Sequence, residues 1–436
     1  MSGPAMQYAS TRASAPVLGL SAAIAAGLAP DGGLYVPERL PKFAPRDFNG
    51  ADSLADIASR LLAPFFADDL LAAELPAICA EAFTFPSPLI DLTTRGDRVL
   101  ELFHGPTAAF KDFGARFLAA SMHRLRRDDA KPLTIIVATS GDTGAAVGAA
   151  FAGLDGFRVA ILYPDGRVSP RQAHQLGCFG GNVRALRVDG SFDDCQRLVK
   201  QALVDEALRA RAPLGSANSI SLGRLLPQMV YYAQSSLLHW RETQGHLNFV
   251  IPTGNLGNAV ACILARACGL PIGRIVLATN ANDVIPKFFA GGDYAPTASV
   301  ATLANAMDVG APSNFERLTW LYPDRAQLRR EFTAHSIDDT QIRATIRERF
   351  ERHGEIFCPH TATAVRVLER LRWDGDEGTW AVVATAHPAK FEGIVEPLIG
   401  TTLASPPSLA ALLERPAHAD PLANDFGALR DVLVAG

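Results

Sequence analysis

From about residue 98 onwards, short apolar runs alternate along the chain with longer segments in which apolar residues recur at helical spacing. The short runs are bounded by glycine, proline or polar residues, which is typical of buried strands. Strands that alternate with helices in this way form parallel sheets with helices on both faces. The pattern therefore predicts an α/β fold, with strands at 99–103, 133–138, 158–163, 183–188, 247–251, 274–279 and 380–384.

The two ends of the chain lack this alternation. Residues 1–95 are rich in Ala, Pro and Leu, and a turn region at 28–37 is followed by short helical patterns. The tail after about residue 405 is also rich in Ala, Leu and Pro, and it predicts one or two short helices. Within the α/β region, Ser191 is expected to cap a helix that runs to about residue 208.

Composition narrows the class of protein. A chain of 436 residues with 48% hydrophobic and 20% charged residues predicts a soluble globular protein of two or three domains. The net charge of -4 leaves no basic surplus to neutralise phosphates, so a nucleic-acid partner is not expected. No apolar run is long enough to span a membrane and no export signal is recognisable, so no membrane partner is expected.

The six cysteines contain no CxxC pair. The spacing favours neither a disulfide framework nor a zinc site, and no metal is predicted. Reduced thiols of this kind are typical of a cytoplasmic protein.

The segment HGPTAAFKDFG at 104–114 places Lys111 at an expected helix start, with Thr107 as the predicted N-cap. The positive end of the helix dipole and the flanking rings of Phe110 and Phe113 both favour a neutral amine, the form that attacks a carbonyl. A Schiff-base lysine for pyridoxal phosphate (PLP) is one interpretation. A solvated surface lysine is the other, and residue types alone favour it.

Three polar strand-to-helix turns add to this picture, because open parallel sheets bind ligands at such turns. The turn at 140–144 suits a carboxylate, and the glycine-rich turn at 254–258 suits a phosphate at a helix N-terminus. Thr385 ends a strand and could present its hydroxyl to a ring nitrogen. Each turn alone is weak evidence, since tight turns need glycine regardless of ligand. Together with Lys111 they supply what a PLP site requires.

These segments make the chain similar to the threonine synthase family, which belongs to the tryptophan-synthase-β-like PLP enzymes of fold type II. HGPTAAFKDFG resembles the family's cofactor-lysine motif, ATSGDTG at 138–144 its substrate-side loop and PTGNLGN at 252–258 its cofactor-phosphate loop. TAHPAKF at 385–391 resembles the segment that meets the pyridine nitrogen. Three motifs are specific to threonine synthases: GLAPDGGLYVP at 27–37, NSISLGRLLPQ at 218–228 and MDVGAPSNFER at 307–317.

The resemblance implies two α/β domains with parallel-type sheets flanked by helices, PLP in the cleft between them, and an N-terminal extension over 1–95. The catalytic region would be 96–436, with a smaller domain inserted at about 115–215 and the larger domain mainly at 216–400. Closure of the smaller domain over substrate is expected, and the protein would be a monomer or homodimer.

The implied reaction converts O-phospho-L-homoserine and water to L-threonine and phosphate. Lys111 would be the catalytic residue and hold PLP, while Arg224 would contact the substrate phosphate. The expected cofactor-binding residues are Lys111, Gly254, Asn255, Leu256, Gly257, Asn258 and Thr385, and the expected substrate-binding residues are Ser140, Asp142, Thr143, Asn218, Ser219 and Arg224.

Several alternative functions stay open. A phospholyase or dehydratase of the same family would release 2-oxobutyrate, and a non-catalytic PLP-binding relative is a further alternative. A dinucleotide-dependent oxidoreductase shares the βα pattern but lacks its GxGxxG fingerprint. Leu256, Asn258 and the pair at 221–222 depart from the family's common residues. His104 is expected to orient the lysine loop, His360 and His387 to be structural, and Lys390 to be either a phosphate contact or a salt-bridged surface residue.

Overall fold

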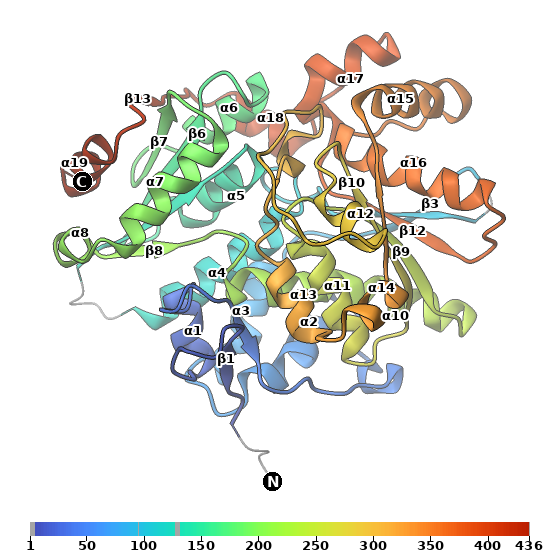
Figure 1. Cartoon of the computed structure of the whole chain (residues 1–436), viewed down its shortest axis with the longest axis horizontal. Coiled ribbons are helices and arrows are strands. Elements are labelled where there is room, and N and C mark those ends of the chain that lie inside the picture. The colour runs from blue at the N-terminus through green and yellow to red at the C-terminus, as the bar shows by residue number, and fades with distance from the viewer. Residues whose placement is uncertain (1–4, 95, 127–130, 436) are drawn as a thin grey trace.

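Two helix-covered sheets form the two halves of the molecule in the computed structural model (Figure 1). The structure describes residues 5–94, 96–126 and 131–435. The first, which we call the large sheet, has six strands in the order β11 (Thr333–Ser336), β10 (Ile272–Thr279), β9 (Leu247–Pro252), β12 (Trp380–Ala384), β4 (Arg98–Glu101) and β3 (Leu89–Asp91). The second, the small sheet, has five in the order β13 (Asp420–Leu422), β7 (Val183–Val188), β6 (Phe157–Pro164), β5 (Leu133–Ala138) and β8 (Leu214–Ser216).

Within the described residues, every strand pair of these two sheets is parallel except β3 with β4. The predicted α/β fold with parallel sheets is therefore confirmed. All seven predicted strands are present, with ends that differ by at most two residues. Within the large and small sheets, the strands that sequence reasoning missed are β3, β8, β11 and β13, and each lies at an edge of its sheet.

The N-terminal region packs beneath both sheets in Figure 1. A two-stranded antiparallel ribbon, β1 (Tyr8–Ser10) with β2 (Tyr35–Pro37), is accompanied by three helices that bury one apolar face, the first of them between the two strands. These are α1 (Leu20–Ala26), α2 (Leu54–Leu62) and α3 (Leu75–Ala82), with 3-10 turns at Pro45–Phe48 and Ala63–Phe66.

The helices around the small sheet are α4 (Lys111–Leu125), α5 (Asp142–Phe151), α6 (Pro170–Gly177), α7 (Phe192–Val204), α8 (Glu206–Arg211), α18 (Pro407–Leu413) and α19 (Phe426–Ala435). The remaining elements are α9 (Leu222–Leu225), α10 (Met229–Thr243), α11 (Gly257–Ala267), α12 (Val284–Phe289), α13 (Phe315–Leu321), α14 (Arg325–Glu331), α15 (Asp339–His353), α16 (Pro359–Trp373) and α17 (Glu392–Ile399), with 3-10 turns at Leu226–Gln228, Asn305–Met307 and Pro388–Phe391.

Two sequence predictions about helices were wrong. The helix capped by Ser191 ends at Val204, because Asp205 has extended backbone and caps the separate helix α8 through its side chain. Thr107 does not cap α4, which begins at Lys111 after Phe110. Ala108 adopts a left-handed conformation, and the extra turn that follows leaves Thr107 four residues before the helix. Its hydroxyl instead donates to Asp112 at 2.7 Å.

One or two short helices were predicted for the C-terminal tail; it forms two, α18 and α19, and it also returns to the small sheet. Strand β13 pairs in parallel with β7, with Asp420 opposite Leu186. Helix α19 then packs against α7 through Leu429 and Leu433, which are both buried. The small sheet therefore contains a strand from the far end of the chain.

The lysine helix α4 is anchored in a core of aromatic rings. Phe113 is fully buried, and its ring lies 4.6 Å from that of Phe85 and 5.2 Å from that of Tyr231. Gly114 lets α9 approach, because a Cβ there would lie 2.8 Å from the Arg224 carbonyl oxygen. The first turn of α4 therefore has a fixed place relative to α9.

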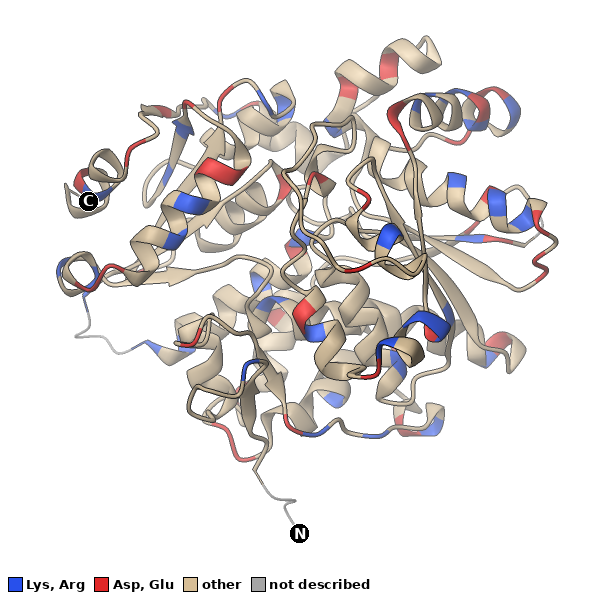
Figure 2. Cartoon of the chain, in the orientation of Figure 1, with Lys and Arg blue, Asp and Glu red and all other residues tan. Residues whose placement is uncertain are grey.

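Acidic and basic residues are interspersed over both halves, as Figure 2 shows. Among the described residues, no helix is long and apolar enough to cross a membrane.

Candidate active site

Lys111 lies where two pockets meet. An inner pocket is lined by the turn after β9, by Arg224, His360 and Thr385, and by Lys111 itself. An outer cavity of about 450 Å³ extends from Lys111 between the N-terminal region and α7. The Lys111 amine lies 4.6 Å from the centre of the Phe110 ring.

Every residue that the sequence predicted for the site lines one of these two pockets. The inner pocket contains Lys111, Asp142, Ser219, Arg224, Gly254, Asn255, Leu256, Gly257, Asn258 and Thr385. The outer cavity contains Ser140, Thr143 and Asn218, and shares Lys111, Ser219 and Asn255 with the inner pocket. Their roles are not shown by this placement and stay predictions.

Burial is the main influence on the Lys111 amine. The pKa of Lys111 is lowered to about 8: burial is the largest cause, the nearby Arg224 guanidinium acts in the same direction, and Asp142 acts in the opposite direction. A lysine with this pKa is partly neutral near neutral pH. The surface-lysine interpretation is therefore not supported, since Lys111 faces two pockets beside a buried cation.

The turn after β9 presents backbone to the inner pocket. Gly254 packs so tightly against Met307 that a Cβ would lie 2.7 Å from its Cα. Leu256 has a positive φ of 61° and leads into α11, whose first residue is Gly257. The turn therefore places a helix N-terminus against the pocket, where backbone N–H groups and the helix dipole favour an anion.

Two asparagines hold this turn. Asn258 accepts hydrogen bonds from Tyr231 at 2.6 Å and Tyr232 at 2.8 Å, which leaves its Nδ2 without a partner in the described chain. Asn255 donates to the Ser219 hydroxyl at 2.7 Å and so joins the turn to the substrate-side segment.

The strand end at Thr385 is paired with the lysine loop, residues 104–110. The Thr385 carbonyl accepts a hydrogen bond from the Phe110 N–H at 2.8 Å, and the Ala108 carbonyl accepts one from the His387 N–H at 3.0 Å. Because Thr385 is buried at the inner pocket, its hydroxyl position is set by the same backbone that sets Lys111.

The loop at 138–144, called the substrate loop after the family segment that it resembles, is shaped by Thr139. Its hydroxyl accepts hydrogen bonds from the N–H groups of Gly141 at 3.0 Å and Gly144 at 2.9 Å. Asp142 is buried and ion-paired with Lys390 at 2.8 Å. Burial alone would raise the pKa of Asp142, but Lys390 and then His360 outweigh it and hold that pKa below its usual range.

Lys390 itself is buried, so the surface location considered for it was wrong, while its ion pair is confirmed. Arg224 is also buried, and it donates to the Ala217 carbonyl at 2.5 Å. Its Nε has no hydrogen-bond partner among the described residues, and burial lowers its pKa to about 10.

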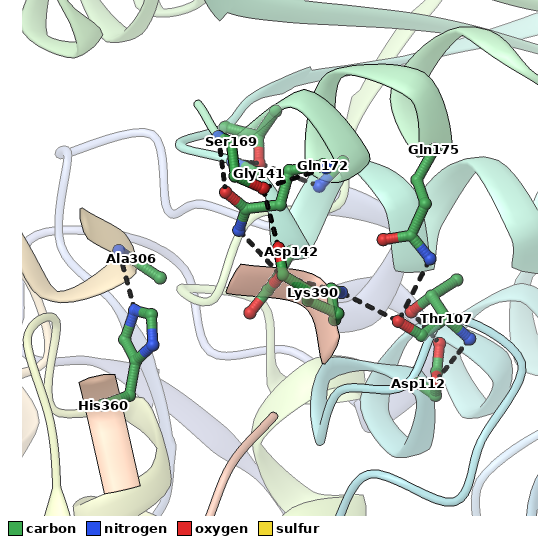
Figure 3. A network of polar contacts seen from close by, with 12 residues as sticks. Thr107, Asp112, Gly141, Asp142, Ser169, Gln172, Gln175, Ala306, His360 and Lys390 are labelled. Carbon is green, nitrogen blue, oxygen red and sulfur yellow. Dashed lines mark hydrogen bonds and ion pairs between the residues drawn. The ribbon is translucent and has the colours of Figure 1, made fainter. Parts of the chain in front are cut away.

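Sequence reasoning did not assign a site role to His360 or Gln172. His360 lines the inner pocket from the first turn of α16, and its Nε2 accepts a hydrogen bond from the Ala306 N–H at 3.1 Å (Figure 3). Gln172 donates to Asp142 at 3.0 Å from α6. No motif marks Gln172, whereas His360 follows the helix-start signal of Pro359. His104 pairs with Glu101 and is not among the residues lining either pocket.

His360 is expected to make the folded protein sensitive to acid. The pKa of His360 is lowered from 6.5 to about 4, chiefly by burial; Asp142 opposes this shift, while Lys390 and Lys111 add to it. Between these values the unfolded chain binds a proton that the folded chain does not. The free energy of unfolding should therefore fall by about 3 kcal/mol as pH falls through this window.

Urea unfolding at a series of pH values measures this effect. His360→Gln should flatten the profile, because its amide oxygen can still accept from Ala306 but does not titrate. An unchanged pH dependence in that variant would assign the effect to other groups, among them His387, whose pKa burial also lowers to about 4.

Comparison with known proteins agrees with this geometry. A family model described as threonine synthase N terminus matches residues 7–83, one described as pyridoxal-phosphate dependent enzyme matches 86–388, and one described as threonine synthase, C-terminal matches 361–433. Threonine synthase of Escherichia coli is 40% identical over 414 residues, which are 94% of this chain and 95% of that one.

Solved structures give the same result. The crystal structure of threonine synthase from Escherichia coli has a TM-score of 0.91 at 39% identity, and covers 99% of this chain and 100% of that one. The chain belongs to the threonine synthase family. The PLP-bound threonine synthase structure from Brucella melitensis matches with a TM-score of 0.89 at 35% identity, over 99% of each chain.

The inner pocket of this threonine synthase family member fits PLP, the family's cofactor. Three polar atoms of its lining residues lack partners among the described residues, namely Arg224 Nε, Asn258 Nδ2 and His360 Nδ1. A polar ligand would satisfy such buried atoms. Lys111 supplies an amine, and the N-terminus of α11 suits the cofactor's phosphate.

Proposed function

We propose that the protein converts O-phospho-L-homoserine and water into L-threonine and inorganic phosphate. Membership of the threonine synthase family supports this reaction. The observation that carries it here is the position of Lys111, a partly neutral amine between the turn after β9, which presents a helix N-terminus, and a cavity large enough for a small amino acid.

PLP, when bound, supplies a carbonyl that an amine can join and a ring that accepts electrons from the substrate's α-carbon. The protein's part is to hold and orient the cofactor and the substrate. Gly254, Asn255, Leu256, Gly257 and Asn258 would hold the cofactor phosphate through backbone N–H groups.

Thr385 would meet the ring nitrogen with its hydroxyl. A hydroxyl is not a carboxylate, so it would leave that nitrogen unprotonated or weakly protonated. Lys111, once replaced by the substrate amine, would carry protons between the substrate carbons, for which an amine with a lowered pKa is suited.

Ser140 and Thr143 line the outer cavity and would bind the substrate carboxylate. Asp142 is directed instead to the inner pocket and neutralised by Lys390, which removes the repulsion that a free carboxylate would exert on an anionic substrate. We therefore place Asp142 on the cofactor side of the site.

Arg224, with Asn218 and Ser219, would hold the substrate phosphate. Arg224→Lys should raise KM for O-phospho-L-homoserine about 10- to 100-fold, because one charge-assisted hydrogen bond to phosphate contributes about 1.5–3 kcal/mol and lysine lacks the second donor direction. The inhibition constant of inorganic phosphate should rise by a similar factor.

A matched control is Arg349→Lys, since Arg349 is also buried but lines neither pocket. Equal KM values in the Arg224 and Arg349 variants would remove Arg224 from the phosphate site.

Product analysis tests the proposed function directly. Purified, cofactor-loaded protein is incubated with O-phospho-L-homoserine, and threonine, phosphate and 2-oxobutyrate are quantified. Equal amounts of threonine and phosphate are expected. Phosphate with 2-oxobutyrate would make the protein a phospholyase, and the absence of both products would contradict catalysis.

The remaining parts of the proposal concern the surroundings of the protein. A small-molecule substrate requires no macromolecular partner for catalysis, and the protein would act as a monomer or homodimer. A cytoplasmic location is supported by its six cysteines, which are all free and buried.

A further inference from the structure

A buried ion pair stands beside Lys111, and the reaction described above does not use its cation. Lys390 Nζ lies 2.8 Å from Asp142 Oδ1, and the side chains of Lys390 and Asp142 are 0% and 5% exposed. The same amine donates to the Thr107 carbonyl at 2.8 Å (Figure 3). Lys390 therefore joins the substrate loop to the lysine loop.

Further side chains complete the network. Gln172 donates to Asp142 at 3.0 Å, while its own oxygen accepts from the side chain of Asn305 at 3.1 Å. Gln175 donates to the Thr107 carbonyl at 3.3 Å, and Thr107 is held from its other side by Asp112. Helix α6 thus braces both loops, as Figure 3 shows.

A buried ion pair of this kind adds little net stability to the folded state. Removing two charges from water costs several kcal/mol, and apolar residues of similar size often serve as well. Its position next to a reactive amine suggests an electrostatic purpose, because the interaction of charges is stronger in a buried site than in water.

Five charged or titratable groups belong to one electrostatic network with Lys111, each on a different element or turn of the site. Asp142 is at the start of α5, Arg224 on α9, His360 on α16, Lys390 in the turn after β12, and Asp112 follows Lys111 on α4. Asp142 favours the protonated form of Lys111, and Arg224 disfavours it. Without Lys390, the carboxylate of Asp142 would lose its ion-pair partner, and its charge would be opposed at Lys111 by Arg224 alone among these groups.

We propose that Lys390 is a positioning residue that cancels the charge of Asp142 at the Lys111 nitrogen while tying the lysine loop to the substrate loop. This inference rests on the proposed function, in which Lys111 holds the cofactor and must release a proton. It gives Lys390 an electrostatic role on the reactive amine in addition to a structural one.

The inference predicts shifts of opposite sign. Lys390→Met leaves a bare carboxylate, so the proton affinity of the Lys111 nitrogen should rise about tenfold. Asp142→Asn leaves a bare ammonium, so that affinity should fall by about the same factor. The double variant has neither charge and should titrate close to the original protein.

The test is a pH titration of the visible absorption of the cofactor-loaded protein, which follows the proton on the Lys111 nitrogen, for the original, both single variants and the double variant. Opposite shifts that cancel in the double variant support the inference. Shifts in one direction, or none, overturn it, because loosened packing has no charge sign. Lys390→Arg keeps the charge and should titrate like the original.

Two controls keep the outcomes distinct. If Lys390→Met does not fold, Asp142→Asn alone decides the sign, since it preserves the shape of the side chain and the contact with Gln172. If Lys111→Ala retains the absorption band, the proposed function fails, and the loss of that band in Lys111→Ala shows that the titration reports on Lys111.

Discussion

Lys111→Ala should abolish both threonine formation and the visible absorption of bound cofactor, with a loss of turnover of about a thousandfold or more. The amine at the junction of the two pockets would be the covalent attachment point and the proton carrier, and alanine can do neither. Removing the side chain also relieves the burial of a cation, so the variant is expected to fold.

The control for this variant is Lys287→Ala, which removes a lysine whose side chain is 68% exposed and ion-paired with Asp283 four residues earlier. It should leave the spectrum and turnover unchanged. An absorption band and threonine formation that survive in Lys111→Ala would show that another amine holds the cofactor.

Gly254→Ala should weaken the binding of the cofactor. An added Cβ would meet the Cα of Met307 at 2.7 Å and its carbonyl oxygen at 2.9 Å, and backbone atoms cannot turn aside as a flexible side chain can. The turn after β9 must therefore move, at a cost of about 1–3 kcal/mol. The apparent affinity for PLP is expected to fall about 10- to 100-fold, since the displaced N–H groups no longer converge on the phosphate.

Gly257→Ala in the same turn is the matched variant. There the nearest atom, Asn314 Nδ2, lies 3.5 Å away, which is an ordinary contact. Thermal unfolding without cofactor should separate the two: Gly254→Ala lowers the midpoint and Gly257→Ala does not. Equal midpoints and equal PLP affinities would contradict the steric argument.

The central strands were predictable because they are buried on both faces and read as continuous apolar runs. Strand β12, for example, is apolar and buried throughout and has the predicted bounds. The edge strands were not predictable, because β3, β8 and β13 have only three residues each and too little apolar content to stand out from loops. Their place is decided by the neighbouring strand, which local sequence does not reveal.

The site was predictable for a related reason. In a parallel sheet the strand-to-helix turns gather at one edge, so the turns after β9 and β12, which are neighbours in the large sheet, could be expected to meet. The turn at 140–144 follows β5 of the small sheet, so its place at the same site was expected only from the resemblance to the family. The error at Thr107 came from local backbone. A left-handed Ala108 could not be anticipated, because alanine has no special preference for that conformation.

The sequence could not predict that Gln172 and His360 belong to the site or that Lys390 is buried, and the reason is different. Each reaches the site from the side of a helix or from a turn whose packing depends on how the two halves meet. Lys390 could be read as a phosphate contact or as an exposed ion pair, and only its distance to Asp142 decided that it is a buried one.

The return of β13 to the small sheet has a consequence for biosynthesis. All strands of the large sheet have been translated once Ala384 has been added. In the small sheet, the edge of β7 remains unpaired until residues 420–422, which form β13, have also been translated. A ribosome adds about 5–20 residues per second, so this edge is exposed for several seconds in every nascent chain. Slow-closing edges are sites of aggregation and chaperone capture, and overproduction should therefore trap chains that are complete around the large sheet but open at β7.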